Sequence, residues 1–204
     1  MLTTFKPIAE SAIQPLARLF KNVNPNIVTF FGLVFPTLFF ICVLQGWYAA
    51  ALVVFVLNLV DMLDGAIARQ QNKVTAFGGF LDSTIDRFAD FTVLAAFAFA
   101  GIVSWNIIAP LIMFSYLISY VRSRIELATK NEVQGSVGIV ERTERLVAVF
   151  VGLLLYALFP GVEVGGSLNL NLAEVVLVVL TVFSFITVVQ RVVFASKRLP
   201  AYNK

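Results

Sequence analysis

The sequence predicts an all-α integral membrane protein, with six transmembrane helices preceded by an N-terminal interfacial amphipathic helix. Two observations support this fold class. Hydrophobic residues make up 59% of the 204 residues, which is well above their share in an ordinary soluble domain. The chain also contains six apolar stretches, each close to the roughly 20 residues that a helix needs to cross a bilayer. We interpret residues 1–204 as a single membrane domain.

The predicted elements follow one another closely along the chain. Residues 4–21 are too polar to cross a bilayer but have the apolar spacing of a helix at the membrane surface, so residues 1–24 are interpreted as an interfacial segment. Pro25 then stands at a favourable position for the start of the first span. The six spans are expected near residues 26–45, 47–69, 78–100, 105–128, 143–159 and 173–194.

Basic residues are distributed unevenly between the two ends of these spans. All fifteen Lys and Arg residues fall at one end or within a few turns of it, and the loops around 45–47, 101–105 and 160–172 contain none. Short cytoplasmic loops are the ones that are rich in Lys and Arg. We therefore expect a multi-pass protein of the cell membrane with both termini in the cytoplasm. The net charge of +3 reflects this topology and an affinity for anionic lipid headgroups, not nucleic-acid binding.

The residue types that are missing or rare narrow the chemistry. The sequence has no histidine and one cysteine, Cys42, within the first predicted span. An intramolecular disulfide and a thiolate metal site are therefore excluded. Any general base must be a carboxylate, a lysine, a tyrosine or a similar group.

Four aspartates stand at helical spacing in the second and third spans. Asp61 and Asp64 are three residues apart and Asp82 and Asp86 are four apart, so each pair lies on one face of its helix. A hairpin that turns near Lys73 would place the two pairs at matching depths. Ionisable groups in membrane segments are costly and usually functional. An all-carboxylate cluster predicts a site for hard divalent cations such as Mg²⁺ or Mn²⁺, at the cytoplasmic end of the two spans.

Two glycines, Gly65 and Gly78, flank this cluster. A glycine lets another group approach the backbone closely, so the pair could leave room for a bulky ligand. The alternative is close packing of helices through small residues. The position of Gly65 between Asp64 and Arg69 favours a role in ligand binding.

The aspartates belong to a longer pattern of 26 residues, Asp-x-x-Asp-Gly-x-x-Ala-Arg, eight residues, then Gly-x-x-x-Asp-x-x-x-Asp. This pattern resembles the signature of the CDP-alcohol phosphatidyltransferase family, with every signature residue present at the family spacing. The resemblance implies a CDP-linked lipid as donor, an alcohol as acceptor and CMP as the leaving group. It also implies a homodimer.

The resemblance implies a role for each signature residue as well. Asp61, Asp64, Asp82 and Asp86 would hold two divalent ions, and Asp86 would also deprotonate the acceptor hydroxyl. Other residues match family positions that hold the cytidine diphosphate part of the CDP-lipid. They are Gly65, Ala68, Arg69 and Gly78, with Asn26 and Thr29 as further candidates.

Arginines near the fourth and fifth predicted spans indicate which kind of alcohol the protein accepts. Arg122 and Arg124 end the fourth span, and Arg142 and Arg145 open the fifth. Arginines recognise anions through paired hydrogen bonds, which fits a phosphorylated alcohol better than serine or free inositol. The alternative for each arginine is an ordinary role in membrane topology, or an ion pair with a neighbouring glutamate.

The segment 119–124, Ser-Tyr-Val-Arg-Ser-Arg, followed by 141–145, Glu-Arg-Thr-Glu-Arg, is similar to the branch of the family that transfers to inositol 1-phosphate. In that branch, residues matching Ser119, Arg122, Arg142 and Arg191 line the inositol phosphate pocket. The donor would be CDP-diacylglycerol or CDP-archaeol, which share a headgroup.

There are three alternatives to this function. A non-enzymatic membrane scaffold, in which the glycines and carboxylates pack helices, would leave the fixed spacing of the signature unexplained. Glycerol 3-phosphate is a second phosphorylated acceptor that would need an arginine pocket. A divalent cation transporter would need acidic residues spread across the bilayer to form a path, whereas here we expect them at one end only.

Overall fold

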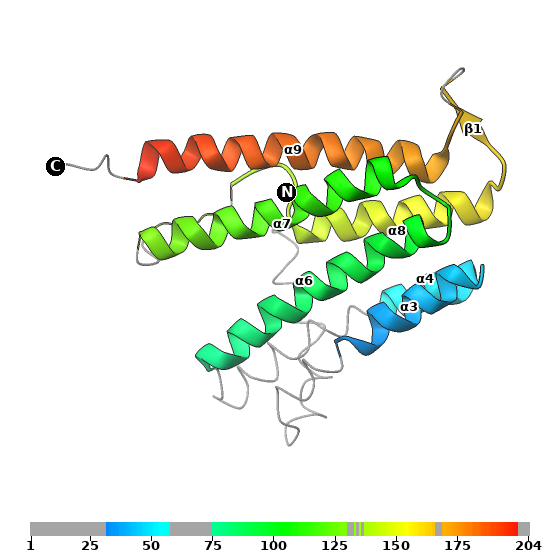
Figure 1. Ribbon diagram of the computed structural model, residues 1–204, viewed down its shortest axis with the longest axis horizontal. Helices are drawn as coiled ribbons and strands as arrows, with labels where there is room; N and C mark the ends of the chain where they lie inside the picture. The colour runs from blue at the N-terminus through cyan, green and yellow to red at the C-terminus, as the bar shows by residue number, and fades with distance from the viewer. Residues whose placement is uncertain are drawn as a thin grey trace. The chain divides into compact units, whose positions relative to one another are not determined.

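The structure, a computed structural model, describes residues 32–57, 75–129, 133, 135, 137–165 and 169–199. This part of the chain is mostly helical and also contains a pair of two-residue strands (Figure 1). It divides into two compact units, Met1–Ala100 and Gly101–Lys204. The predicted interfacial segment, residues 1–24, lies outside the described residues.

The first unit contains α3 (Val34–Leu44), α4 (Tyr48–Leu57) and α6 (Ala76–Phe99). The chain reverses between α3 and α4 at Gly46, whose φ of +72° favours glycine. The Phe39 ring on α3 packs edge-on against Phe55 of α4 at a centroid distance of 5.5 Å, and it lies 6.4 Å from the Phe97 ring of α6. This aromatic cluster joins the three helices.

The two halves of α6 have different surroundings. Its first turn is capped by Thr75, whose hydroxyl accepts the Gly78 N–H at 3.0 Å. Near its other end, every residue from Val93 to Ala98 is buried, and three of these six residues are alanines that allow close packing. The C-terminal half therefore contributes to the core of the unit, and the N-terminal half carries Asp82 and Asp86.

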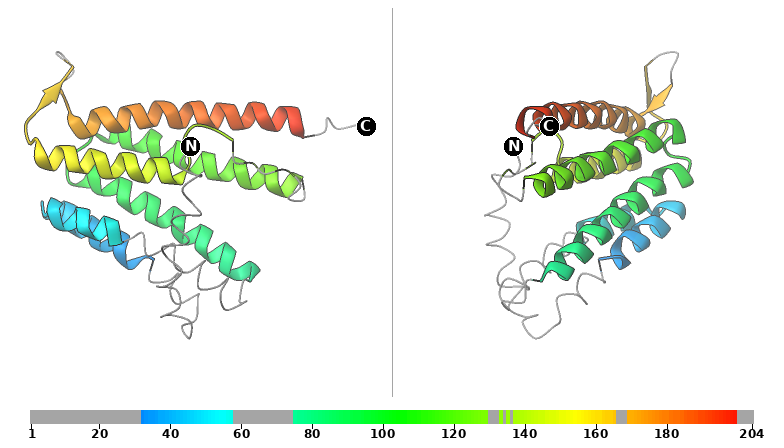
Figure 2. Two further views of the ribbon diagram at one scale, coloured as in Figure 1. Left: turned by 180° about the vertical axis from the view of Figure 1, so that it is seen from behind. Right: turned by 60° about the vertical axis from the view of Figure 1, so that its left-hand side comes forward.

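The second unit contains α7 (Trp105–Ala128), α8 (Arg142–Leu158) and α9 (Leu172–Arg198). α9 packs against both α7 and α8 (Figure 2). Of the described helices, α7 and α9 are long and apolar enough to cross a membrane. Strands β1 (Glu163–Val164) and β2 (Leu170–Asn171) form an antiparallel pair between α8 and α9. The sequence did not predict this pair.

The helix ends agree closely with the predicted spans where the structure describes them. The predictions 78–100, 105–128, 143–159 and 173–194 correspond to α6, α7, α8 and α9, the last of which continues to Arg198. α3 corresponds to the C-terminal part of the first predicted span, 26–45. α4 corresponds to the N-terminal part of the second, 47–69. The remaining parts of these two spans lie outside the described residues.

The expectation that acidic residues lie at one end only was wrong, because Glu163 in β1 and Glu174 in the first turn of α9 stand beside the 160–172 loop, which contains no Lys or Arg. Glu174 Oε2 accepts the N–H of Asn171 at 3.1 Å, and its Oε1 accepts the N–H of Ser104 at 3.3 Å. The Asn171 amide in turn donates to the carbonyl of Ile102 at 2.6 Å. Glu174 therefore ties the starts of α7 and α9 together, and this local structural role accounts for a carboxylate at that end.

Candidate functional site

Asp82 and Asp86 lie one turn apart on α6, and both are half-buried. The Asp86 side chain is 14% exposed, and its Oδ2 lies 3.6 Å from Arg87 Nη2. The i, i+4 spacing on a continuous helix places both carboxylates on the same face. The structure therefore places this carboxylate pair on one face of a continuous helix, α6.

Asp90 continues this row by a further turn, and it is not among the residues predicted from the sequence. Its side chain is 7% exposed, and its Oδ2 also lies 3.6 Å from Arg87 Nη2. The spacing of four residues from Asp86 is the signal that could have found it. A buried carboxylate needs a partner of opposite charge, and Arg87 supplies it. We interpret Asp90 as a structural member of the row Asp82, Asp86 and Asp90.

The described residues contain only part of the predicted metal and donor site. Asp82 and Asp86 supply carboxylate oxygens, which are the ligands that Mg²⁺ and Mn²⁺ prefer, so they fit a divalent cation. Within the described ranges, no group of three or more His, Cys, Asp or Glu residues could hold a metal. Gly78 lies in the first turn of α6, half-buried beside its cap. The predicted residues outside the described ranges are Asn26, Thr29, Asp61, Asp64, Gly65, Ala68 and Arg69.

The predicted acceptor residues of α7 stand near its C-terminal end. Arg122 donates from Nε to Glu126 Oε1 at 2.8 Å, and its side chain is 47% exposed. Ser119 is half-buried, and its hydroxyl donates to the Ser115 carbonyl at 3.4 Å. Arg124 is exposed. Arg122 therefore forms an ion pair with a neighbouring glutamate, which was the alternative to a role in acceptor binding. An exposed pair of this kind is weak, so a phosphate could displace Glu126 from Arg122.

The predicted acceptor residues of α8 lie in its first turns. Arg142 opens the helix and is half-buried, whereas Arg145 is 5% exposed. Glu144 Oε2 accepts the N–H of Glu141 at 3.1 Å, which is one half of a capping box. Glu144 therefore has a structural role at the helix start.

Arg191 on α9 is the most deeply buried of the predicted acceptor residues, with an exposure of 2%. Its Nε donates to the Val137 carbonyl at 2.7 Å, and its Nη1 donates to the Ile118 carbonyl at 2.5 Å. Charges of both signs act on it, those of Arg122 and Arg145 and those of Glu126 and Glu141. The second unit thus brings arginines from three helices near one another, with two glutamates among them.

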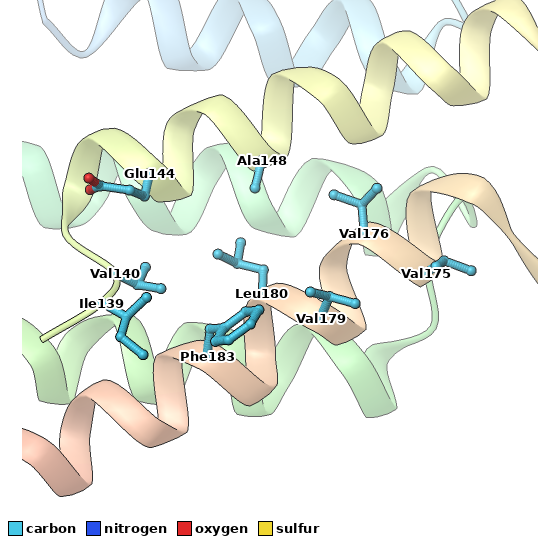
Figure 3. A pocket seen from close by; sticks show the side chains of 9 residues that line it. All are labelled: Ile139, Val140, Glu144, Ala148, Val175, Val176, Val179, Leu180 and Phe183. Atoms are coloured by element: carbon cyan, nitrogen blue, oxygen red, sulfur yellow. The ribbon is translucent and has the colours of Figure 1, made fainter. Parts of the chain in front are cut away.

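An apolar cavity of about 390 Å³ opens between α8 and α9 (Figure 3). Val179, Leu180 and Phe183 of α9 contribute to its wall, and Glu144 lies at one end. None of the predicted metal, donor or acceptor residues lines it. Its wall suits hydrocarbon and not a charged substrate.

Comparison with known proteins gives a consistent result. Residues 22–192 match the family model described as CDP-alcohol phosphatidyltransferase. The chain is 36% identical to an archaetidylinositol phosphate synthase from Pyrococcus horikoshii, over 98% of each chain. It is also 36% identical to a phosphatidylinositol phosphate synthase from Mycolicibacterium smegmatis, over 92% of this chain and 81% of that protein.

Solved structures show a similar fold. A crystal structure of phosphatidylinositol phosphate synthase from Mycobacterium tuberculosis, in complex with manganese and citrate, matches with a TM-score of 0.79 and 28% identity. The match covers 94% of this chain and 92% of that one. A second structure of that enzyme, with CDP-DAG bound, matches with a TM-score of 0.77 and 27% identity, over 94% of this chain and 97% of the other.

Proposed function

The chain belongs to the CDP-alcohol phosphatidyltransferase family, and we propose that it transfers the phospholipid moiety of a CDP-lipid to myo-inositol 1-phosphate, with release of CMP. The near full-length similarity to inositol phosphate synthases is the observation that carries this function. The arginines of α7, α8 and α9 support it, because a phosphorylated acceptor needs cationic partners.

The donor is CDP-diacylglycerol or CDP-archaeol, and the product is the corresponding phosphatidyl- or archaetidyl-inositol phosphate. Relatives named for each of these products are found among the similar proteins. On the donor side, Arg69, Gly65, Ala68 and Gly78 hold the cytidine diphosphate part, with Asn26 and Thr29 as further contacts.

The proposed metal site consists of Asp61, Asp64, Asp82 and Asp86. Two Mg²⁺ or Mn²⁺ ions bound there supply positive charge that neutralises the diphosphate, so that an alcohol can approach phosphorus. The manganese in the similar crystal structure supports the use of a divalent cation. Carboxylates from two segments give a hard-oxygen site, which suits these ions.

The transfer step needs one proton acceptor, and we assign that role to Asp86. Its carboxylate takes the proton from the acceptor hydroxyl as the hydroxyl oxygen forms a bond to the lipid-side phosphorus. The bond from that phosphorus to the bridging oxygen breaks, and CMP leaves with that oxygen. The assignment rests on the resemblance of Asp86 to the last aspartate of the family signature, and the sequence contains no histidine that would compete for this role.

The acceptor phosphate is held by side chains of α7, α8 and α9, namely Ser119, Arg122, Arg124, Arg142, Arg145 and Arg191. Each hydrogen bond to a charged group stabilises a complex by about 1.5 to 3 kcal/mol. Arg122 would exchange its weak pair with Glu126 for the phosphate. An acceptor without a phosphate provides no anionic group for these arginines to bind.

The protein acts in the cell membrane as a single domain. The lipid chains of the CDP-lipid donor remain in the bilayer, while its diphosphate reaches the cytoplasmic boundary of the membrane. We propose six spans, an interfacial segment at residues 1–24, and cytoplasmic termini and active site. The apolar character of α7 and α9 supports this topology, as does the one-sided distribution of Lys and Arg. We expect a homodimer.

The function is tested by measuring CMP release from purified protein with one CDP-lipid and a panel of acceptors. The panel contains inositol 1-phosphate, glycerol 3-phosphate, serine and free inositol. We expect the highest kcat/KM with inositol 1-phosphate and little release with the two acceptors that lack a phosphate. A preference for glycerol 3-phosphate would keep the reaction class but change the product, and release with no alcohol would reject the function.

A further inference from the structure

The Glu126 carboxylate lies in the last turn of α7, one turn after Arg122. Its Oε1 accepts a hydrogen bond from Arg122 Nε at 2.8 Å. The same oxygen accepts the N–H of Gly135 at 3.4 Å, which is longer than the usual distance for such a bond. Glu126 therefore has a close partner, which is a proposed acceptor residue, and a more distant partner in the loop that joins α7 to α8.

The position of Glu126 does not favour the stability of α7. The C-terminal end of a helix is the negative end of its dipole, so a carboxylate in the last turn is unfavourable there. Arg122 precedes Glu126, and this order stabilises a helix less than the reverse order does. The pair is also partly exposed, with 47% of the Arg122 side chain and 27% of the Glu126 side chain accessible, so it contributes little to folding. A role toward the arginines accounts better for a carboxylate at this place.

Glu126 offsets repulsion among the arginines while no acceptor is bound. The charges of Arg122 and Arg145 act on Arg191, and both Arg145 and Arg191 are buried. Like charges that are withdrawn from water repel one another unless opposite charges stand nearby. Glu126 and Glu141 supply those charges, because both act on Arg191 with the opposite sign. When a phosphate enters, it brings negative charge of its own, and one of these two carboxylates becomes dispensable.

Of the two glutamates, Glu126 is the one that can leave. Glu141 is the N-cap of α8 and belongs to its capping box together with Glu144, so its movement would cost the helix its cap. Glu126 has no capping role in α7, and its side chain is partly exposed. It also keeps the N–H of Gly135 as a partner when Arg122 turns away.

Gly135 holds this second partner close to the pair. A Cβ at position 135 would lie 3.0 Å from the Arg122 carbonyl oxygen and 3.2 Å from Arg122 Cγ. The loop therefore lies directly against the backbone and the inner part of the Arg122 side chain. The absence of a side chain at position 135 makes this close approach possible. A carboxylate released by Arg122 thus finds a backbone donor within reach and is not left without a hydrogen bond.

We propose that Glu126 is an internal stand-in for the phosphate of the acceptor: it binds Arg122 in the empty site, and a phosphorylated alcohol displaces it toward the Gly135 N–H. This inference rests on the proposed acceptor site. A phosphate monoester carries a charge of about −1.5 to −2 at neutral pH, more than a carboxylate, so it is the stronger partner for Arg122. The exchange lowers the apparent affinity for the acceptor, because only molecules in which Arg122 is released can bind it.

The first test removes the charge of Glu126 and keeps the shape of its side chain. Glu126→Gln retains an oxygen for the Gly135 N–H, and it is expected to lower the KM for inositol 1-phosphate roughly two- to sixfold. The kcat and the KM for CDP-lipid should not change. Glu163→Gln is the matched control, because it makes the same change of charge at an exposed residue of β1.

Three results of this test would overturn the inference. One is an unchanged acceptor KM in Glu126→Gln, and another is an equal fall in Glu163→Gln. The third is a raised acceptor KM in Glu126→Gln, which would indicate that Glu126 orients the guanidinium for the phosphate and does not compete with it.

Inorganic phosphate separates this competition from the identity of the alcohol. It should inhibit wild type competitively with respect to the acceptor, and its inhibition constant should fall in Glu126→Gln by the same factor as the acceptor KM, because an internal competitor weakens every ligand of Arg122 equally. A different factor would overturn the inference. If wild type prefers glycerol 3-phosphate, the product is wrong, and the KM for that acceptor must fall by the same factor for the inference to stand.

A double variant tests whether Glu126 acts through Arg122. In an Arg122→Ala background, Glu126→Gln should no longer lower the acceptor KM, because the pair is already broken. A gain that persists in this background would show that Glu126 repels the phosphate directly, and it would overturn the exchange. If Arg122→Ala alone leaves the acceptor KM unchanged, the proposed acceptor role of Arg122 fails and the inference fails with it. If Arg122→Ala raises the KM but Glu126→Gln has no effect in wild type, the inference alone fails.

Discussion

Arg87 forms an ion pair with Asp90 one turn later on α6, with 3.6 Å between Arg87 Nη2 and Asp90 Oδ2. The same nitrogen lies 3.6 Å from Asp86 Oδ2. Asp90 is thus tied to a cation of the protein, while the signature residues Asp82 and Asp86 precede it on the same row. Arg87 thus pairs with both carboxylates, and it is the family signature, which includes Asp86 and not Asp90, that assigns Asp86 to the reaction.

Asparagine at any of the four signature aspartates should abolish most CMP release while the protein still inserts and purifies. The variants are Asp61→Asn, Asp64→Asn, Asp82→Asn and Asp86→Asn. Each removes a metal ligand or the base, and we expect a loss in kcat of roughly 10²-fold or more. Ser83→Ala, at an exposed position on α6, is the matched control. Near-normal turnover in any two of the asparagine variants would reject the metal site.

Asp90→Asn should affect stability more than catalysis. The change leaves Arg87 without the full charge of a buried partner, and we expect a loss of about 1–2 kcal/mol in the free energy of unfolding, reduced because Arg87 is 26% exposed. Thermal unfolding and kcat should be measured together, with kcat falling less than in Asp86→Asn. An Asp90 variant as inactive as Asp86→Asn, with a raised requirement for metal, would make Asp90 a ligand.

Asp86 should differ from Asp61 in its effect on donor binding. If Asp86 acts chiefly as the base, Asp86→Asn binds CDP-lipid nearly as well as wild type. Asp61→Asn should lose affinity, because it is assigned to the cation that neutralises the diphosphate. Calorimetry can compare the two, and equal losses would make Asp86 mainly a metal ligand.

Chelation of divalent cations should inactivate the enzyme reversibly. EDTA is expected to abolish CMP release, and added Mg²⁺ or Mn²⁺ should restore it, because the diphosphate needs neutralisation before transfer. Activity that survives EDTA and extensive dialysis would contradict the dependence on an exchangeable cation.

The arginines assigned to the acceptor should control its binding. Arg122→Ala and Arg142→Ala are expected to raise the KM for inositol 1-phosphate roughly ten- to a hundredfold, with little change in the KM for CDP-lipid. Arg198→Ala is the control, because that arginine lies at the end of α9 with its guanidinium 5.7 Å from the Phe194 ring centroid. Variants that weaken only the donor would assign these arginines to the diphosphate.

Much of the fold could be predicted because its signals are local. Apolar runs with clear ends located α6, α7, α8 and α9, and the spacing of Asp82 and Asp86 placed them on one face. The β1–β2 pair has only two residues per strand, too few for a periodic pattern.

The contacts that organise the acceptor side could not be predicted in the same way. The carbonyls that Arg191 binds are separated from it by 54 and 73 residues, and neither has a sequence signal because every residue carries a carbonyl. The hydrogen bond from the Ser104 N–H to Glu174 likewise joins residues that are 70 positions apart. Such contacts follow from tertiary packing, whereas the residue types that bind substrate appear in the sequence itself.

The most direct test of the proposed function is a competition between two acceptors in one reaction. Wild-type protein is given a CDP-lipid and equimolar inositol 1-phosphate and glycerol 3-phosphate, and the lipid products are quantified by mass spectrometry. Their ratio equals the ratio of the two kcat/KM values. We predict that the inositol phosphate lipid dominates, by roughly 10²-fold or more. A product mixture dominated by the glycerophosphate lipid would contradict the assigned acceptor.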